Sequence, residues 1–257
     1  MTYAPLELTG KVAVVIGGTT GIGRALAIGL AEAGADVVPT SRRSEQVESA
    51  AAEIEQRGRR SLRITSDVTD RKSLEKLRDG CVREFGKVDI LVNSAGRTKR
   101  TPTLEVSEAE WNEILETNLT GVLRGCQIFG PHMIERRYGR IINIASISSF
   151  VALFEVAAYS ASKAAVASLT KSLAIEWARH GICVNGIAPG VFRTSLNEKL
   201  LEGPRGQEFL VRIPAKRFGQ TNELVGAAIF LASDAASFVN GEILAVDGGF
   251  LASGVNQ

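Results

Sequence analysis

Short runs of apolar residues recur along the chain without alternating polar positions. They are rich in valine and isoleucine and occupy residues 12–16, 37–38, 90–92, 141–144 and 183–187. Runs of this kind are typical of strands that are covered on both faces. Longer segments with helical spacing lie between them, for example residues 23–33, 44–57 and 73–85. This order predicts an α/β fold in which a parallel sheet carries helices on both faces, the doubly wound architecture.

Glycines mark the ends of the predicted helices. Gly34, Gly58, Gly86 and Gly139 each stand just before a predicted strand, where a helix is expected to end. The chain contains no repeat of fixed period, no low-complexity tract and no Pro/Ser-rich linker. We therefore expect one domain over residues 1–257, with an irregular excursion near residues 191–218.

Composition and charge narrow the function. The 257 residues include 30 Lys and Arg against 28 Asp and Glu, a net charge of +2, which argues against a nucleic-acid partner. The two histidines and three cysteines are scattered without metal-ligand or disulfide spacing. No signal segment and no membrane-spanning run is evident. We expect a reduced, cytoplasmic protein that binds no metal, no membrane and no nucleic acid.

A glycine-rich turn follows the first predicted strand and opens a helix. Its glycines permit a tight turn, and the free N–H groups of the helix start attract a pyrophosphate. The alternative is a plain tight turn between strand and helix. If the turn binds phosphate, its contacts are Gly17, Thr19, Thr20, Gly21, Ile22 and Gly23.

The end of the second predicted strand should meet the adenosine ribose of a dinucleotide. An acidic residue there would accept the free 2′-hydroxyl, but the nearby Asp36 lies at the opposite end of the strand. The correct end carries Ser41, Arg42 and Arg43 instead. Because arginine pairs bidentately with phosphate, these residues favour NADP(H) over NAD(H). The alternative is that both arginines are solvated loop charges.

Tyr159 and Lys163 are four residues apart in a predicted helix, so their side chains share one face. A nearby ammonium stabilises a phenolate, so this pair could exchange a proton with a substrate. The alternative at this spacing is a tyrosine that packs and a lysine that is only a solvated charge. Ser146 favours proton exchange, because it follows the predicted strand at 141–144, at the sheet edge where such folds bind ligands.

Four features follow one another along the chain: the glycine turn, Asn93-Ser94-Ala95-Gly96, Ser146 and the Tyr159/Lys163 pair. Their order resembles that of the short-chain dehydrogenase/reductase family. The resemblance covers essentially the whole chain. Asn118 matches the family's catalytic asparagine. The family often has threonine and a second asparagine where this chain has Ile16 and Ser94, which bears on local stability more than on chemistry.

The resemblance implies a Rossmann fold with a mostly or wholly parallel seven-stranded sheet and a homotetramer or homodimer. It implies that Tyr159 exchanges a proton with the substrate oxygen, that Ser146 orients that oxygen, and that Lys163 lowers the tyrosine pKa and holds the nicotinamide ribose. Asn118 would anchor a proton path. Further cofactor contacts implied by the family motifs are Asp67, Val68, Asn93, Ala95, Gly96, Pro189, Gly190 and Thr194.

The substrate is less well defined. Segments 192–197, 214–219 and 237–241 resemble gluconate 5-dehydrogenase-like members, which act on a sugar acid such as 5-ketogluconate. Arg97, Lys99 and Arg100 follow the Asn-Ser-Ala-Gly turn and would suit an anionic substrate, although such loops are usually only solvated. The same charges would steer an acidic carrier protein, so a 3-oxoacyl-acyl-carrier-protein reductase is the alternative. A dinucleotide sensor without catalysis is a further one.

Overall fold

A parallel sheet forms the centre of the computed structural model, which describes residues 3–194 and 197–254. Six strands occur in these residues, in the order β2-β1-β3-β4-β5-β6, and every neighbouring pair is parallel. This confirms the predicted architecture. The strands are β1 (Val12–Ile16), β2 (Asp36–Thr40), β3 (Ile90–Asn93), β4 (Gly139–Ile144), β5 (Ile182–Pro189) and β6 (Ile243–Val246).

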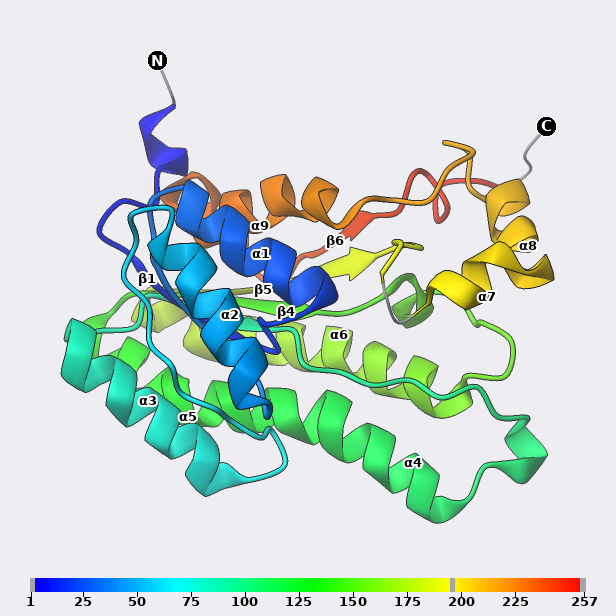
Figure 1. The fold of residues 1–257 in the computed structure, drawn as a ribbon, viewed down its shortest axis with the longest axis horizontal. Coiled ribbons are helices and arrows are strands. Elements are labelled where there is room, and N and C mark those ends of the chain that lie inside the picture. Colours follow the sequence, from blue (N-terminus) through cyan, green and yellow to red (C-terminus); the bar gives the residue numbers. More distant parts are fainter. Residues whose placement is uncertain (1–2, 195–196, 255–257) are drawn as a thin grey trace.

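Helices cover both faces of the sheet (Figure 1). One layer contains α1 (Gly21–Glu32), α2 (Ser44–Glu55) and α9 (Val225–Ala232). The opposite layer contains α3 (Arg71–Phe85), α4 (Glu108–Leu115), α5 (Gly121–Arg136) and α6 (Ala157–Trp177). The three helical segments expected from spacing correspond to α1, α2 and α3, with ends that differ by two residues at most. The pattern did not single out β6, in which Ile243 is buried but the next three residues are partly buried or exposed.

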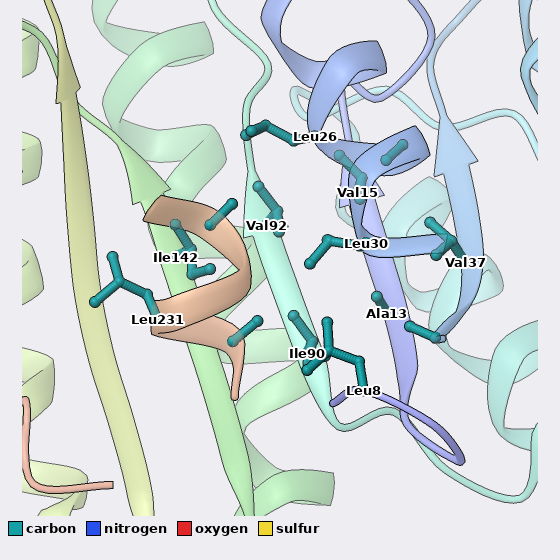
Figure 2. Close-up of a cluster of buried hydrophobic side chains, with 14 of the residues drawn as sticks. Leu8, Ala13, Val15, Leu26, Leu30, Val37, Ile90, Val92, Ile142 and Leu231 are labelled. Carbon is teal, nitrogen blue, oxygen red and sulfur yellow. The ribbon is translucent and has the colours of Figure 1, made fainter. Parts of the chain in front are cut away.

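The core divides into two halves because strand side chains alternate between faces. Figure 2 shows the half in which Ala13 and Val15 of β1 meet Leu26 and Leu30 of α1. Val14, the intervening residue of β1, packs into the other half beneath α3, α5 and α6. Both faces of β1 are therefore buried, which is why its five residues read as a continuous apolar run.

The outer edge of β2 explains why the described sheet has six strands and not the expected seven. Residues 60–66 run beside this edge, and the backbone N–H of Val37 donates to the carbonyl of Arg60 at 3.1 Å. The N–H of Ser66 donates to the carbonyl of Ser41 at 3.0 Å. Pro39 lies between these two contacts and faces the same side, but it has no N–H to donate. The ladder is interrupted there, and residues 60–66 form no regular strand.

One of the four expected helix ends is different. Gly34, Gly58 and Gly86 have positive φ angles, as a helix terminus requires, but Gly139 is the first residue of β4. Arg137 takes the left-handed position after α5, with φ 55°. A Cβ on Gly139 would lie 2.7 Å from the sulfur of Met133, so the glycine is needed for close packing.

All six strands end at the same edge of the sheet. Ile16 pairs with both Thr40 and Asn93, and Asn93 pairs with Asn143 one residue before the end of β4. The chain order reverses around β1, between β2 and β3, which is where open α/β sheets bind their ligands. Two short helices, α7 (Glu198–Glu202) and α8 (Pro204–Arg212), lie beyond the strand ends on this side (Figure 1).

Candidate active site

The glycine turn between β1 and α1 brings backbone close to backbone. Gly17 has φ +80°, and a Cβ on it would lie 2.6 Å from the backbone nitrogen of Ala95. Thr20 precedes α1 without capping it through its side chain, so the first N–H groups of the helix lack that partner. Turn and helix start thus form a cradle that fits a pyrophosphate. The predicted contacts Thr19, Gly21, Ile22 and Gly23 belong to this same segment.

The carboxyl end of β2 carries the residues expected to meet the adenosine ribose. The hydroxyl of Ser41 is buried and has no hydrogen-bond partner in the described part of the chain. Arg42 and Arg43 are exposed, and no ion pair forms between either of them and another described residue. Asp36 lies at the far end of β2 and accepts a hydrogen bond from the N–H of Arg60 at 2.9 Å. One unsatisfied hydroxyl and two available guanidinium groups therefore lie together.

Val68, Asn93 and Ala95 line one small pocket at the end of β1 and β3, together with Ile16, Thr117 and Val122. Asp67 precedes this pocket, and its carboxylate accepts hydrogen bonds from the N–H and hydroxyl of Thr69. The carboxamide of Asn93 points to a neighbouring strand, where it donates to Asn143 at 2.8 Å. Asn93 therefore fixes the sheet next to the pocket, while Val68 and Ala95 supply its apolar wall.

Tyr159 and Lys163 lie in the first two turns of α6, on the same face. The Lys163 ammonium donates a hydrogen bond to the backbone carbonyl of Ile144 at 2.6 Å. It lies 5.8 Å from the centroid of the Tyr159 ring. The predicted juxtaposition of the two side chains is therefore present, and the lysine is anchored to the end of β4.

Ser146 faces this pair from the segment that follows β4. Its hydroxyl accepts a hydrogen bond from the N–H of Ser148 at 3.1 Å and is also within hydrogen-bonding reach of Tyr159. The hydroxyl of Ser149 donates to the backbone carbonyl of Lys163 at 2.8 Å. Two hydrogen bonds thus tie α6 at Lys163 to residues on both sides of Ser146.

Burial sets the charge states of the pair. Burial raises the pKa of the Tyr159 phenol, and the hydrogen bond with Ser146 only partly opposes it. Burial also lowers the pKa of Lys163 to about 8. The net shift of the Tyr159 pKa is therefore upward in this arrangement, and burial is its largest cause. At neutral pH Tyr159 is a neutral phenol that can donate a proton.

Asn118 lies in a π-helical turn, Glu116–Thr120, between α4 and α5. Such turns insert an extra residue into a helix and often occur at functional sites. The Asn118 carboxamide accepts from the N–H of Arg97 at 2.8 Å and donates to the Arg97 carbonyl at 2.9 Å and to the Ser162 hydroxyl at 3.0 Å. The Cβ position of Gly96 is 3.5 Å from Asn118 Oδ1 and 3.7 Å from Lys163 Nζ. Asn118 and Lys163 therefore meet on either side of Gly96.

The segment after β5 closes the opposite side of the site. Pro189 ends β5, and the N–H of Gly190 donates to the carbonyl of Val246 at 2.9 Å. The methyl group of Thr194 lies 3.7 Å from the point where a Cβ on Gly21 would stand. The predicted contact Thr194 therefore reaches the glycine turn, whereas Gly190 packs against Asp247 at the end of β6. Residues 195–196 of the 192–197 segment lie outside the described residues.

The basic loop after Gly96 is neutralised. Arg97 pairs with Glu113, Lys99 with Glu110 at 2.5 Å, and Arg100 with Glu155 at 2.5 Å. These acidic residues come from α4 and from the loop before α6, so the sequence did not reveal the pairing. The loop therefore presents little net charge to an anionic substrate or carrier protein.

Two residues that sequence reasoning missed connect parts of the site. Arg124 on α5 donates to the carbonyl of Val68 and pairs with Glu116 at 2.7 Å, so it joins the small pocket to the π turn. Glu155 has φ 61°, a conformation that non-glycine residues rarely adopt. Nothing in the local sequence around Arg124 or Glu155 signals either property.

Neither a metal cluster nor a membrane-spanning helix occurs in the described ranges. No three His, Cys, Asp or Glu side chains within residues 3–194 and 197–254 are grouped so that they could hold a metal ion. No helix in the same ranges is long and apolar enough to cross a bilayer.

Comparisons with known proteins agree with this geometry. The family model described as enoyl-(acyl carrier protein) reductase matches residues 17–251. Gluconate 5-dehydrogenase of Gluconobacter oxydans is 43% identical over 248 residues, which cover 96% of this chain and 97% of that protein. D-threitol dehydrogenase of Mycolicibacterium smegmatis is 41% identical over 244 residues, 95% of this chain and 94% of that protein.

A solved structure gives the same result. The gluconate 5-dehydrogenase from Burkholderia cenocepacia, in complex with NADP and tartrate, is 41% identical and superposes with a TM-score of 0.93 over 97% of this chain and 98% of that one. The chain therefore belongs to the short-chain dehydrogenase/reductase family, and it is an oxidoreductase that acts on CH–OH groups or the corresponding carbonyls with a nicotinamide dinucleotide.

Proposed function

We propose that this protein is an NADP(H)-dependent oxidoreductase that interconverts a ketone and a secondary alcohol on a sugar acid such as 5-ketogluconate. The arrangement of Ser146, Tyr159 and Lys163 carries the proposal, because a buried phenol, a hydroxyl and an ammonium converge at the carboxyl edge of the sheet. A sensor that only binds a dinucleotide would not need these three groups together.

The nicotinamide, when bound, supplies or accepts the hydride. In the reducing direction, the Tyr159 phenol donates its proton to the substrate oxygen as negative charge develops there. Ser146 donates a second hydrogen bond to that oxygen and holds it in place. This type of proton transfer contributes roughly 10²- to 10⁴-fold to the rate.

Lys163 and Asn118 support this transfer. The Lys163 ammonium, fixed by the Ile144 carbonyl, would stabilise the phenolate that remains on Tyr159 and would hold the nicotinamide ribose. Asn118, held by three hydrogen bonds, lies next to Lys163 across Gly96 and is positioned to pass protons onward. In the reducing direction the proton that restores Tyr159 would then arrive from the α6 side of the site, and in oxidation it would leave by the same route.

The preference for NADP(H) rests on the end of β2. A 2′-phosphate would receive hydrogen bonds from the Ser41 hydroxyl, which has no partner in the described chain, and from Arg42 and Arg43. Within residues 36–43, all of which the structure describes, Asp36 is the one carboxylate, and it lies at the far end of β2. The NADP complex of the Burkholderia cenocepacia relative supports the same preference.

Similarity to gluconate 5-dehydrogenase supports the sugar-acid substrate. A neutral polyol is the second candidate, because D-threitol dehydrogenase is almost equally similar. An acyl-carrier-protein substrate has less support, because the basic loop that would attract such a carrier is paired with Glu110, Glu113 and Glu155. We therefore place the sugar acid first.

The remaining expectations concern the whole chain. We propose a single domain over residues 1–257, because one sheet takes strands from residue 12 to residue 246. We further propose that the 191–218 segment is a substrate lid that packs on its own apolar residues, among them Leu201, Ile213 and Phe218. A cytoplasmic homotetramer or homodimer remains our expectation, and light scattering tests the assembly.

A spectrophotometric screen tests the function. NADPH and NADH oxidation would be followed with 5-ketogluconate, an uncharged ketose, a diketone and an acetoacetyl thioester. We expect turnover of 5-ketogluconate with NADPH, and a loss of roughly 10²- to 10⁴-fold in Tyr159→Phe with NADPH binding unchanged. Tight NADPH binding without turnover of any carbonyl would refute the proposal, and so would near-normal activity of Tyr159→Phe.

A further inference from the structure

The first turn of α8 contacts the loop that connects the two candidate catalytic residues. Arg205 donates a hydrogen bond from Nη2 to the backbone carbonyl of Phe154 at 3.0 Å. Phe154 lies between Ser146 and Tyr159 in the chain and is largely exposed. Arg205 therefore links α8 to the loop between Ser146 and Tyr159. We call the part of this loop around Phe154 the rim of the site.

Three segments meet at this rim, next to Phe154. The carboxylate of Glu155 pairs with Arg100, and its backbone carbonyl accepts a hydrogen bond from the N–H of Thr101 at 2.9 Å. Arg100 and Thr101 belong to the loop that follows Gly96. The strained backbone of Glu155 thus joins this loop to the one before α6, immediately beside the residue that Arg205 contacts.

The charges at this junction do not balance. Arg100 has Glu155 as its partner, whereas Arg205 has no carboxylate within ion-pairing distance among the described residues. Burial lowers the pKa of Arg205, and the neighbouring charge of Arg100 lowers it further, although Glu208 and Glu155 partly compensate. A half-buried guanidinium that donates to a single carbonyl among the described residues has N–H groups left for an anion.

We propose that Arg205 binds the carboxylate of the substrate, so that the lid segment itself selects sugar acids over neutral sugars. The guanidinium presents two parallel N–H groups, which match the two oxygens of a carboxylate. Arg100 is not assigned to the substrate carboxylate, because its guanidinium is already paired with Glu155. This inference rests on the proposed function and identifies which residue recognises the acid group.

A substrate-charge comparison tests the assignment. Kinetic constants would be measured with NADPH for 5-ketogluconate and for an uncharged ketose, in wild type, Arg205→Gln and Arg205→Lys. Arg212→Gln is the matched control, because it removes an arginine from the same helix, one that pairs with Glu208. We expect Arg205→Gln to raise KM for the sugar acid roughly ten- to hundredfold and to change KM for the ketose less than about twofold. Arg205→Lys should recover part of the loss, and Arg212→Gln should resemble wild type.

The outcomes separate the two proposals. If Arg205 only fastens the lid to the Phe154 loop, Arg205→Gln will weaken charged and uncharged substrates equally, and the inference is wrong. An unchanged KM for both substrates overturns it as well. If wild type turns over no sugar acid at all, the proposed function fails and the inference fails with it. Turnover by wild type combined with unaltered charge preference in the variant removes the inference alone.

Discussion

The Lys163 ammonium donates a 2.6 Å hydrogen bond to the Ile144 carbonyl while only 5% of the residue is exposed. A buried ammonium that donates one hydrogen bond to the described protein is costly, and burial accordingly lowers its pKa from 10.5 to about 8. We assign the Lys163 ammonium to proton transfer. Its charge in this buried position therefore lowers the free energy of unfolding.

Replacement of Lys163 by methionine should abolish most activity yet stabilise the protein. The lowered pKa corresponds to roughly 3 kcal/mol at about 1.4 kcal/mol per unit, and the lost hydrogen bond offsets about 1 kcal/mol. We expect the free energy of unfolding at pH 7 to rise by roughly 2 kcal/mol in Lys163→Met. Denaturant unfolding measures the gain, and Lys171→Met, an exposed change on the same helix, is the control. A less stable Lys163→Met would contradict this account.

The pH dependence of that gain follows from the sign of the shift. Below pH 8 the buried lysine is charged in both the folded and unfolded states, so the full penalty applies. Between pH 8 and 10.5 the unfolded state binds more protons at this residue, so wild type gains stability as pH rises. We expect the difference between Lys163→Met and wild type to shrink across this window. A constant difference would show that the lysine does not titrate in it.

Carbonyl reduction should also decline on the alkaline side. Tyr159 remains protonated because burial raises its pKa, but Lys163 loses its charge above about pH 8. We expect kcat/KM for reduction to fall with an apparent pKa near 8. Lys163→Arg, if active, should lack this alkaline limb, because arginine keeps its charge. The measurement is an initial-rate profile between pH 6 and 10 at saturating NADPH.

Gly17→Ala should weaken both folding and cofactor binding. The new methyl group would lie 2.6 Å from the Ala95 nitrogen, and φ is +80°. We expect a loss of roughly 2–4 kcal/mol in the free energy of unfolding. Gly58→Ala is the control, because it has φ +73° with open space around it and should cost only about 1 kcal/mol. Equal losses in the two variants would show that close approach to Ala95 does not matter.

Removing the charges after β2 should change cofactor preference. In the double variant Arg42→Gln, Arg43→Gln we expect KM for NADPH to rise roughly ten- to hundredfold, with little change for NADH. Arg83→Gln, which removes an exposed arginine of α3, is the control. A parallel rise for both cofactors would mean that these arginines do not read the 2′-phosphate.

Arg124→Gln should lower kcat by roughly tenfold or more, although Arg124 lies outside the proposed chemistry. It joins the Val68 carbonyl to Glu116 at the start of the π turn, and its loss should let Asn118 shift. Arg71→Gln, which loses a contact to Gln127 on the neighbouring surface, is the control. Arg124→Lys should restore part of kcat. A change confined to thermal stability would show that Arg124 is only structural.

Much of the fold was predictable because the apolar runs are buried on both sheet faces. The five residues of β1 and the helical spacing of α3 follow directly from this burial. A seventh strand was expected, and its absence from the described sheet was not predictable because it depends on the direction in which Pro39 faces. The role of Gly139 was also missed, because only the packed structure shows Met133 against it.

The candidate site likewise contains residues that the sequence reveals and residues that only the structure reveals. Ser146, Tyr159 and Lys163 are visible in the sequence because a family motif fixes their spacing. The partners of Arg97, Lys99 and Arg100 are not, because Glu110, Glu113 and Glu155 lie elsewhere in the chain. Arg205 gave no signal, since its significance comes from a contact with Phe154 that is 51 residues distant.

Pro39 also affects how molecules of this protein meet one another. The outermost strand of an open sheet can recruit a strand from a second copy and so begin an aggregate. At this border, residues 60–66 cover β2, and Pro39 denies any incoming strand a backbone donor midway along it. The same imide that interrupts the ladder therefore protects the protein from edge-to-edge self-association at high concentration.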